Sequence, residues 1–138
     1  MTTLNERNSA AIKEFRENSG KLGGRFEGTP VLLLSTKGAK TGKTRINPLV
    51  YLPDDDRMFV FASKAGAPTS PDWYHNLVAN PDVTVEVGTE TFPARATVVS
   101  AKERDEIYAS QASKHPVFVD YQKKTTRKIP VVELVRVQ

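Results

Sequence analysis

Residues 31–51 read VLLLSTKGAKTGKTRINPLVY. Two apolar runs, residues 31–34 and 46–51, flank a segment with four basic and no acidic residues, residues 37–45, which we call the basic loop. Short runs of Val, Leu and Ile bounded by Gly and Pro predict strands, and Gly38 and Gly42 let the backbone turn tightly between them. A cationic, glycine-bearing loop between two strands suits a multiply charged anion such as phosphate. A solvated hairpin tip is the alternative explanation of the same charges.

The basic loop is not a P-loop. That motif has four residues between its first Gly and the Gly-Lys pair, and a helix follows it so that the helix N-terminus faces the phosphates. Here three residues separate Gly38 from Gly42, and residues 45–51 have the composition of a strand. The spacing argues against a nucleotide triphosphatase.

The composition of the whole chain narrows the function further. At 138 residues it fits one domain with a substantial core. It has no cysteine, and the spacing of its two histidines suggests no metal site. The net charge is +4, and residues 1–50 carry nine Lys/Arg against four acids, so the excess lies near the basic loop. Such a surface suits an acidic ligand, nucleic acid or an anionic membrane. No apolar run is long enough to predict a transmembrane span or a signal peptide, so a cytoplasmic protein is expected.

Hydrophobic periodicity and turn residues predict the elements. Helices are expected over residues 5–18, 71–79 and 101–113, and strands over residues 30–36, 44–52, 57–63, 83–87, 90–99 and 129–137. The glycine-rich residues 19–29 are expected to be a flexible connector. This order predicts a β-rich α+β fold, an antiparallel β-barrel of about six strands with peripheral helices. We divide it into residues 1–24, a helix and connector, and residues 25–138, a barrel that binds a cofactor.

Local signals predict where some elements begin. Ser70 is expected to cap the helix over residues 71–79 with Pro71 at its first position, and Ser100 with Glu103 forms a capping box for the next helix. The helix over residues 5–18 has a narrow apolar face that includes Leu4, Ala11, Ile12 and Phe15. Packing against the domain is favoured over membrane anchoring, and a weak peripheral contact with the inner membrane face stays open.

A second cluster follows the third expected strand. Residues 62–68 read ASKAGAP and residues 71–76 read PDWYHN. The small side chains of Ala62, Ala65 and Gly66 allow a flat ligand to approach the backbone. Ser63 offers a hydroxyl, Lys64 a cation and the sole tryptophan an aromatic face with one N–H donor. Each residue alone also fits an ordinary core or surface role.

These three motifs in this order resemble the deazaflavin-dependent nitroreductases and quinone reductases that use coenzyme F-420. The resemblance covers about residues 25–137 and implies a split β-barrel related to those of flavin reductases and pyridoxamine-phosphate oxidases. It also implies a cofactor site. The implied cofactor-binding residues are Lys40, Thr41, Lys43 and Arg45 for the phosphate and polyanionic tail, Asn47 and Pro48 beside the groove, Ala62, Ser63, Lys64 and Ala65 along the deazaflavin and ribityl chain, and Trp73, Tyr74 and Asn76 in the wall near the phosphate.

The chain departs from this family at the substrate side. Members that activate nitroimidazoles place several tyrosines around the substrate, and the corresponding positions here are Val50, His115 and Phe118. Only Tyr121 remains tyrosine. Tyr121 and Ser63 are therefore the candidate catalytic residues, because either hydroxyl could supply a proton to the substrate. Packing with its hydroxyl at the surface is the other interpretation of Tyr121.

The sequence thus predicts an oxidoreductase that passes a hydride from reduced coenzyme F-420 to a small quinone, enone or activated nitro compound. The alternatives are an FMN-dependent reductase on a related barrel and a binding or carrier protein without turnover. A nucleic-acid partner is not expected, because the basic loop carries no aromatic side chain for base stacking. The oligomeric state, monomer or homodimer, is left open.

Overall fold

The computed structural model of the protein describes residues 4–26 and 28–137. Its helices and strands are, in order, α1 (Leu4–Glu17), η1 (Gly24–Phe26), β1 (Val31–Lys37), β2 (Thr44–Asp54), β3 (Arg57–Phe61), η2 (Lys64–Gly66), α2 (Asp72–Ala79), β4 (Asp82–Val87), β5 (Glu90–Val98), α3 (Ala101–Lys114), α4 (Val117–Lys123) and β6 (Val131–Arg136). The two η elements are single 3-10 turns. All six expected strands are present, and three of the four α-helices match expected ones.

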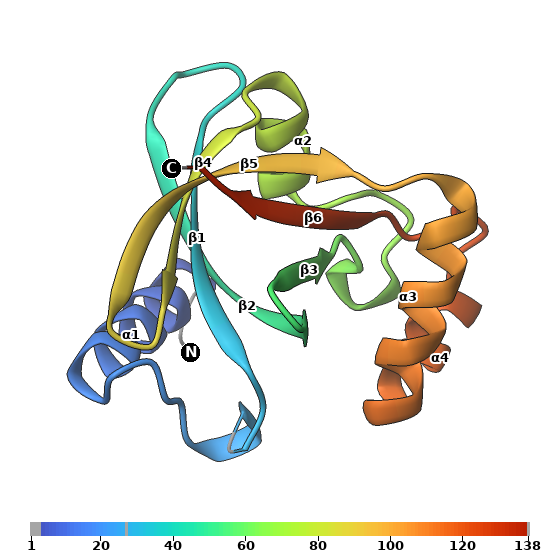
Figure 1. The fold of residues 1–138 in the computed structure, drawn as a ribbon, viewed down its shortest axis with the longest axis horizontal. Coiled ribbons are helices and arrows are strands. Elements are labelled where there is room, and N and C mark those ends of the chain that lie inside the picture. Colours follow the sequence, from blue (N-terminus) through green and yellow to red (C-terminus); the bar gives the residue numbers. More distant parts are fainter. Residues whose placement is uncertain (1–3, 27, 138) are drawn as a thin grey trace.

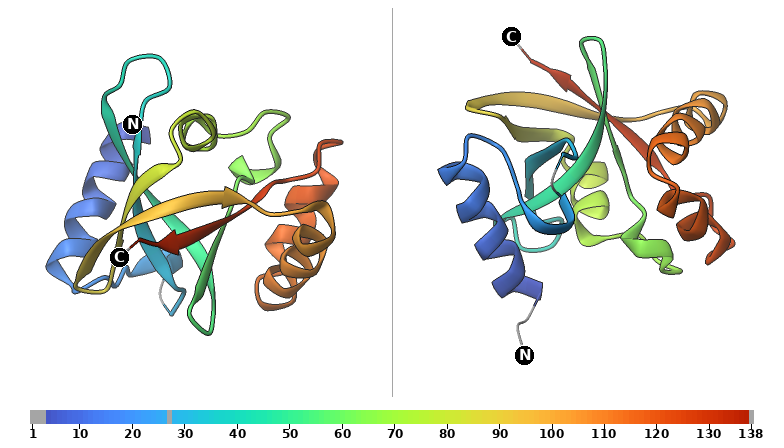
Figure 2. Two further views of the ribbon diagram at one scale, coloured as in Figure 1. Left: turned by 45° about the horizontal axis from the view of Figure 1, so that its top comes forward. Right: turned by 90° about the horizontal axis from the view of Figure 1, so that it is seen from below.

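The six strands form one closed barrel in the order β1-β2-β3-β6-β5-β4, and every neighbouring pair is antiparallel. The predicted β-barrel with peripheral helices is confirmed. Helix α1 and the α3–α4 pair lie on opposite sides of the barrel, while α2 lies beside the β1–β2 loop (Figures 1 and 2). The hairpin between β2 and β3 turns through Asp55 and Asp56, with Asp54 opposite Arg57, as the aspartate run predicts.

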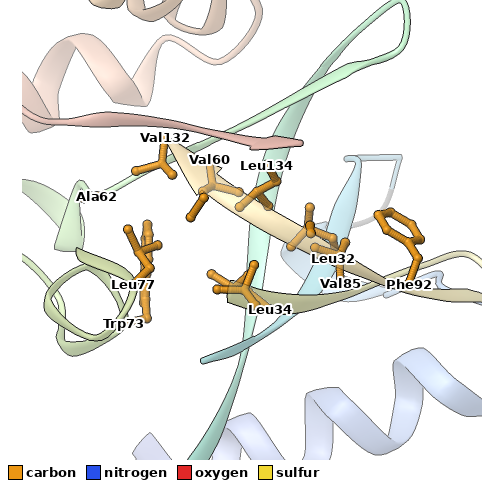
Figure 3. Packing of buried hydrophobic residues seen from close by; sticks show 13 residues of the cluster. Leu32, Leu34, Val60, Ala62, Trp73, Leu77, Val85, Phe92, Val132 and Leu134 are labelled. Carbon is orange, nitrogen blue, oxygen red and sulfur yellow. The ribbon is translucent and has the colours of Figure 1, made fainter. Parts of the chain in front are cut away.

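The barrel interior is filled by alternating side chains from its strands (Figure 3). Leu32 and Leu34 of β1 point into it, as do Val83 and Val85 of β4. Trp73 and Leu77 of α2 join the same cluster, so α2 closes one opening of the barrel. The alternation of β4 follows from the two-residue period of a strand with one face buried.

Strand β1 is apolar on both faces for a separate reason. Val31 and Leu33 point away from the interior and pack against Phe15 of α1, which is 1% exposed. Ala11 and Ile12 of the same helix pack against this cluster. Helix α1 therefore uses its apolar face against the barrel, and the proposed boundary at residue 24 stays a prediction. The side chain of Leu4 lies outside the described residues.

Two glycines allow the connector after α1 to approach the β4–β5 hairpin. A Cβ at Gly20 would lie 2.5 Å from the Cα of Gly88, which is closer than real contacts allow. Gly20 also has a φ of +90°, a region that suits glycine. Arg16 then pairs with Glu86 at 2.9 Å and ties α1 to β4.

The outer face of β3 and β6 is covered by α3 and α4. Phe59, Phe61 and Val131 pack there against Ile107, Tyr108 and Phe118 in a cluster of their own. The Ser100 cap of α3 is confirmed, since its Oγ accepts a hydrogen bond of 3.3 Å from the Glu103 N–H. The Glu103 carboxylate pairs with Arg57.

Several expected boundaries were wrong. Ser70 does not cap α2: Pro71 holds the N-cap position, and the Ser70 hydroxyl lies beside Arg127. Strand β3 ends at Phe61, because Ser63 to Gly66 turn into η2. Strand β6 begins at Val131, after Pro130. Helix α4 was not expected. Among the described residues, no helix is both long enough and apolar enough to cross a membrane.

Candidate active site

A cavity of about 400 Å³ opens between β2, the segment after β3, α2 and α4. Most of its lining residues are apolar, but polar atoms, including those of Thr29, Ser63, Lys64, His115 and Tyr121, contribute as much of its accessible surface as apolar atoms do. The lining residues are Phe26, Thr29, Pro48, Leu49, Val50, Phe61, Ser63, Lys64, Ala65, Pro71, Trp73, His115, Val117, Phe118 and Tyr121. A cavity lined mainly by apolar residues, with a few convergent polar groups, is the usual form of a small-molecule site.

The cavity unites residues that sequence reasoning drew from separate motifs. Six of the candidate site residues line it, namely Pro48, Ser63, Lys64, Ala65, Trp73 and Tyr121. The three positions that the resemblance places beside the substrate, Val50, His115 and Phe118, line it too. The positions expected on the substrate side and those expected on the cofactor side therefore meet in one cavity.

Strand β2 connects this cavity with the basic loop. Arg45, Asn47 and Leu49 lie on one face of β2 because side chains of a strand alternate, and Leu49 lines the cavity. Four residues along a strand span about 13 Å, so Arg45 lies about that far from Leu49. An elongated ligand could thus reach from the cavity along β2 to the cations.

The basic loop is folded by its own hydrogen bonds. The Gly38 N–H donates to the Lys43 carbonyl at 2.8 Å, and the Gly42 N–H donates to the Gly38 carbonyl at 2.9 Å. The Thr41 hydroxyl accepts from the Lys43 N–H at 3.2 Å, so it shapes the turn. Gly42 has a φ of +71°, which favours glycine.

The cations at this end of the site are available to a ligand. The side chains of Lys40, Lys43, Arg45 and Lys64 are exposed. The ion pairs among the described residues involve none of these four cations. Their charges are therefore not neutralised by nearby carboxylates, as expected of a surface that receives an anion.

Asn76 of α2 fastens the basic loop to the barrel. Its Oδ1 accepts from the Ala39 N–H at 3.0 Å, and its Nδ2 donates to the Thr36 hydroxyl at 3.2 Å. Both Asn76 and Thr36 are buried. Asn76 therefore positions the loop through both ends of its amide, and a direct cofactor contact stays a prediction.

The segment that begins at Ser63 has an unusual backbone. Lys64, Ala65 and Gly66 have consecutive φ values of 47°, 54° and 83°, all in the left-handed region. Non-glycine residues rarely adopt this region, and when they do they often mark functional sites. A Cβ at Gly66 would lie 2.7 Å from the Tyr121 carbonyl oxygen, so this segment packs directly on α4.

Three candidate cofactor residues, Ala62, Trp73 and Tyr74, are more buried than expected of residues lining a cofactor groove. Ala62 is fully buried in the interior cluster (Figure 3) and is not one of the residues that line the cavity. Trp73 is 5% exposed, and it packs in the interior while one side lines the cavity. Tyr74 is half-buried and contacts His75 edge to face, with ring centroids 5.8 Å apart.

Tyr121 projects from α4 toward the cavity. Its ring contacts Phe118 edge to face, with centroids 5.2 Å apart, and the Tyr121 hydroxyl has no partner among the described residues. Tyr108 differs, because its hydroxyl donates to the Phe118 carbonyl at 2.6 Å and is buried. Burial raises the pKa of Tyr108 to about 12.

Sequence reasoning missed several residues of this site. Phe26 and Thr29, from the connector, line the cavity, and so does Val117. Arg127 lies behind the segment after β3 and binds it through four hydrogen bonds. No motif surrounds Arg127, and some 60 residues separate it from its partners, so no signal in the sequence pointed to it.

Comparisons with known proteins agree with this architecture. The family model for F420H(2)-dependent quinone reductases matches residues 7–136. An F420H(2)-dependent quinone reductase of Mycobacterium tuberculosis (strain ATCC 25618 / H37Rv) is 41% identical over 129 residues, covering 88% of this chain and 85% of the relative.

Two solved structures resemble the chain in both fold and sequence. An F420-H2 dependent reductase (FDR-A) superposes with a TM-score of 0.69 and 37% identity, covering 76% of this chain and 93% of its own. A domain-swapped dimer superposes with a TM-score of 0.71 and 34% identity, covering 91% and 92%. The expected split-barrel relationship is confirmed. With a matching family model across nearly its whole length, the chain belongs to the F420H(2)-dependent quinone reductases.

Proposed function

We propose that this protein reduces a quinone-type acceptor with a hydride from reduced coenzyme F-420. The observation that carries the proposal is the path along β2, which joins a cavity of about 400 Å³, lined mainly by apolar residues, to a loop whose exposed cations form no ion pair with the described residues. A flat ring fits the first, and a polyanionic tail fits the second. Enone and activated nitro compounds are further acceptors of the same chemical class.

The residues present suit this cofactor in size and charge. Lys40, Lys43 and Arg45 are exposed and form no ion pair with the part of the chain that the structure describes, so they can bind phosphate and carboxylates by charge-assisted hydrogen bonds. Asn47 and Pro48 follow on β2 toward the cavity. Ser63, Lys64 and Ala65 line the cavity with small or flexible side chains, which leaves room for a ring against their backbone. Thr41 and Asn76 shape the basic loop through their hydrogen bonds, and Ala62 and Tyr74 belong to the packing of the barrel interior; direct contacts of these four residues with the cofactor remain predictions.

When bound, the deazaflavin supplies a hydride donor that moves two electrons together. The protein then has to hold donor and acceptor in contact and exclude water. Trp73, Phe61 and Phe118 provide apolar walls for this purpose. The proton that completes reduction of a carbonyl acceptor comes from the Tyr121 or Ser63 hydroxyl, both at the cavity, or from solvent.

The experiment that tests this function compares two cofactors. Purified protein is titrated with oxidised coenzyme F-420 and, separately, with FMN, and binding is followed by fluorescence. We expect micromolar binding of F-420 only, and then oxidation of reduced F-420 when a soluble quinone is added. Binding of FMN alone would support the FMN-dependent reductase instead. Tight F-420 binding without turnover on any quinone would indicate a carrier protein.

The oligomeric state and the cellular location of the protein are further proposals. The domain-swapped dimer among the related structures makes a homodimer the state to test first, by light scattering on purified protein. A cytoplasmic location fits the proposed cofactor chemistry. Contact with a membrane through α1 is less favoured, because Ala11, Ile12 and Phe15 already pack against the barrel.

A further inference from the structure

We propose that Arg127 is a positioning residue for the active site, because it turns the backbone N–H groups of Ser63 and Lys64 toward the ligand. This inference rests on the proposed function, since the ligand in question is the F-420 cofactor. It assigns a role to a residue outside the cavity lining that sequence motifs do not mark.

The Arg127 guanidinium forms hydrogen bonds with both ends of one loop, residues 62–70, which we call the pocket loop. Its Nε donates to the Ala67 carbonyl at 3.0 Å, and its Nη1 lies 3.3 Å from the Ser70 hydroxyl. Its Nη2 donates to the carbonyls of Ala62 at 3.1 Å and Ser63 at 3.0 Å. A planar fork with donors in fixed directions can hold such an arrangement, whereas a lysine ammonium cannot.

By holding the carbonyls of Ala62 and Ser63, these hydrogen bonds determine the direction of the N–H groups of Ser63 and Lys64. In a trans peptide the carbonyl oxygen and the amide hydrogen lie on opposite sides of the C–N bond. Because the Ala62 and Ser63 carbonyls face Arg127, the N–H groups of Ser63 and Lys64 point away from it. Both residues line the cavity, and their N–H groups have no acceptor among the described residues.

The backbone at this point forms a recognised type of anion-binding concavity. Ser63 is right-handed helical, with φ −78° and ψ −41°, and Lys64 follows with a φ of 47°. Successive right- and left-handed residues direct neighbouring N–H groups into one concave site. An oxygen that carries negative charge on the bound cofactor would accept from both N–H groups.

This conformation needs support from outside the loop. Three consecutive residues with positive φ, two of them not glycine, are costly unless the surroundings hold them in place. One support is the contact of Gly66 with the backbone of Tyr121. The other is Arg127, whose hydrogen bonds reach carbonyls on both sides of this turn.

The charge of Arg127 acts in the same direction. Its hydrogen-bond partners among the described residues are carbonyl and hydroxyl oxygens, without a carboxylate. Partial burial lowers the pKa of its guanidinium, which still remains charged. A cation behind the pocket loop, not neutralised by an ion pair, favours negative charge on the ligand in front of it.

The test compares Arg127→Lys and Arg127→Gln with Arg57→Lys. Arg57 is a matched control, because its guanidinium also makes several hydrogen bonds, to Glu133 and Glu103 on the barrel exterior. The dissociation constant of oxidised F-420 is measured by fluorescence, and the melting temperature of each variant is measured alongside. We expect Arg127→Lys to weaken binding about tenfold although it keeps the charge, Arg127→Gln to weaken it further, and Arg57→Lys to leave it unchanged.

A spectroscopic measurement separates positioning from general stability. In wild-type protein, the ¹⁵N–¹H signals of Ser63 and Lys64 should shift when F-420 binds, and in Arg127→Lys these shifts should shrink while those of the basic loop persist. Wild-type affinity in Arg127→Lys would overturn the role of Arg127 alone. So would a loss of affinity that merely follows the melting temperature across all three variants. If wild-type protein does not bind F-420, the proposed function fails together with this inference.

Discussion

At the scale of single residues, two tyrosines on neighbouring helices, Tyr108 and Tyr121, differ in their surroundings and therefore in what their hydroxyls can do. Tyr108 is buried, and its hydroxyl donates a hydrogen bond to the Phe118 carbonyl. Tyr121 lines the cavity, and its hydroxyl has no partner among the described residues. Both are phenols, yet only Tyr121 is placed to donate a proton to a ligand.

Replacing Tyr121 with Phe removes only that hydroxyl. We expect F-420 affinity to hold and turnover to fall, on the order of tenfold, because a positioned proton donor is lost. Steady-state kinetics with reduced F-420 and a quinone measure this, and Tyr108→Phe is the matched control, since its hydroxyl lies outside the cavity. Unchanged turnover would leave Tyr121 only a packing role. Loss of cofactor binding would mean that Tyr121 contacts the cofactor rather than lying on the substrate side of the deazaflavin.

Tyr108 makes stability depend on alkaline pH. Its pKa is raised to about 12 by burial, above the ordinary value of 10, so the folded state favours the protonated phenol. This contribution is fully present below about pH 10 and is lost as the pH rises toward 12. Wild-type protein should therefore lose melting temperature more steeply than Tyr108→Phe between pH 10 and 12. Parallel curves for the two proteins would contradict this assignment.

Single residues were predicted to lie at the cavity where a sequence motif surrounded them. Ser63, Lys64, Ala65 and Trp73 stand in a recognisable run, and all four line the cavity. The role of Asn76 in holding the basic loop depends on Thr36 and Ala39, which come close only when α2 packs on β1. Contacts that exist only after folding leave no mark on local sequence.

At the scale of elements, the basic loop makes the most direct prediction. Replacing both Lys40 and Arg45 with Ala should weaken F-420 binding by at least about tenfold and flatten its salt dependence, because charge-assisted contacts with the anionic tail are lost. Fluorescence titration at several salt concentrations measures both effects. Lys102→Ala with Arg136→Ala removes the same charges elsewhere and should change neither. Wild-type affinity and salt slope in the Lys40 and Arg45 variant would make the loop a solvated tip.

Elements with a clear period or cap were predicted well, and those with mixed signals were not. Val83 and Val85 alternate with polar residues and form β4, and Ser100 caps α3 as expected. Helix α4 was missed because its apolar residues follow no clear helical period: Phe118 is buried, while Val117 and Val119 are largely exposed. Its helical conformation depends on packing against η2 and α3, which local sequence does not encode.

At the scale of the whole molecule, barrel closure gathers a site from distant segments. Val50 lies on β2, His115 follows α3, and Phe118 lies on α4, yet all three line one cavity with Tyr121. The order of the strands was not predicted in detail, because pairing of β3 with β6 joins residues 70 or more positions apart. Only the closed barrel brings the substrate-side positions together.

The residues that line this cavity predict which acceptors the protein reduces. On the resemblance to deazaflavin-dependent nitroreductases, tyrosines are expected at the positions of Val50, His115 and Phe118, so this cavity has three fewer phenolic hydroxyls while keeping Tyr121. An acceptor that needs several hydrogen-bond donors loses most of its orientation here, whereas a quinone or enone carbonyl needs only one. We therefore expect quinone or enone reduction with little or no nitrite release from a bicyclic nitroimidazole, measured with the same enzyme and reduced F-420. Quinone turnover in the same preparation is the control for active protein. Rapid nitrite release would show that the apolar lining and Tyr121 alone suffice to orient the nitro compound.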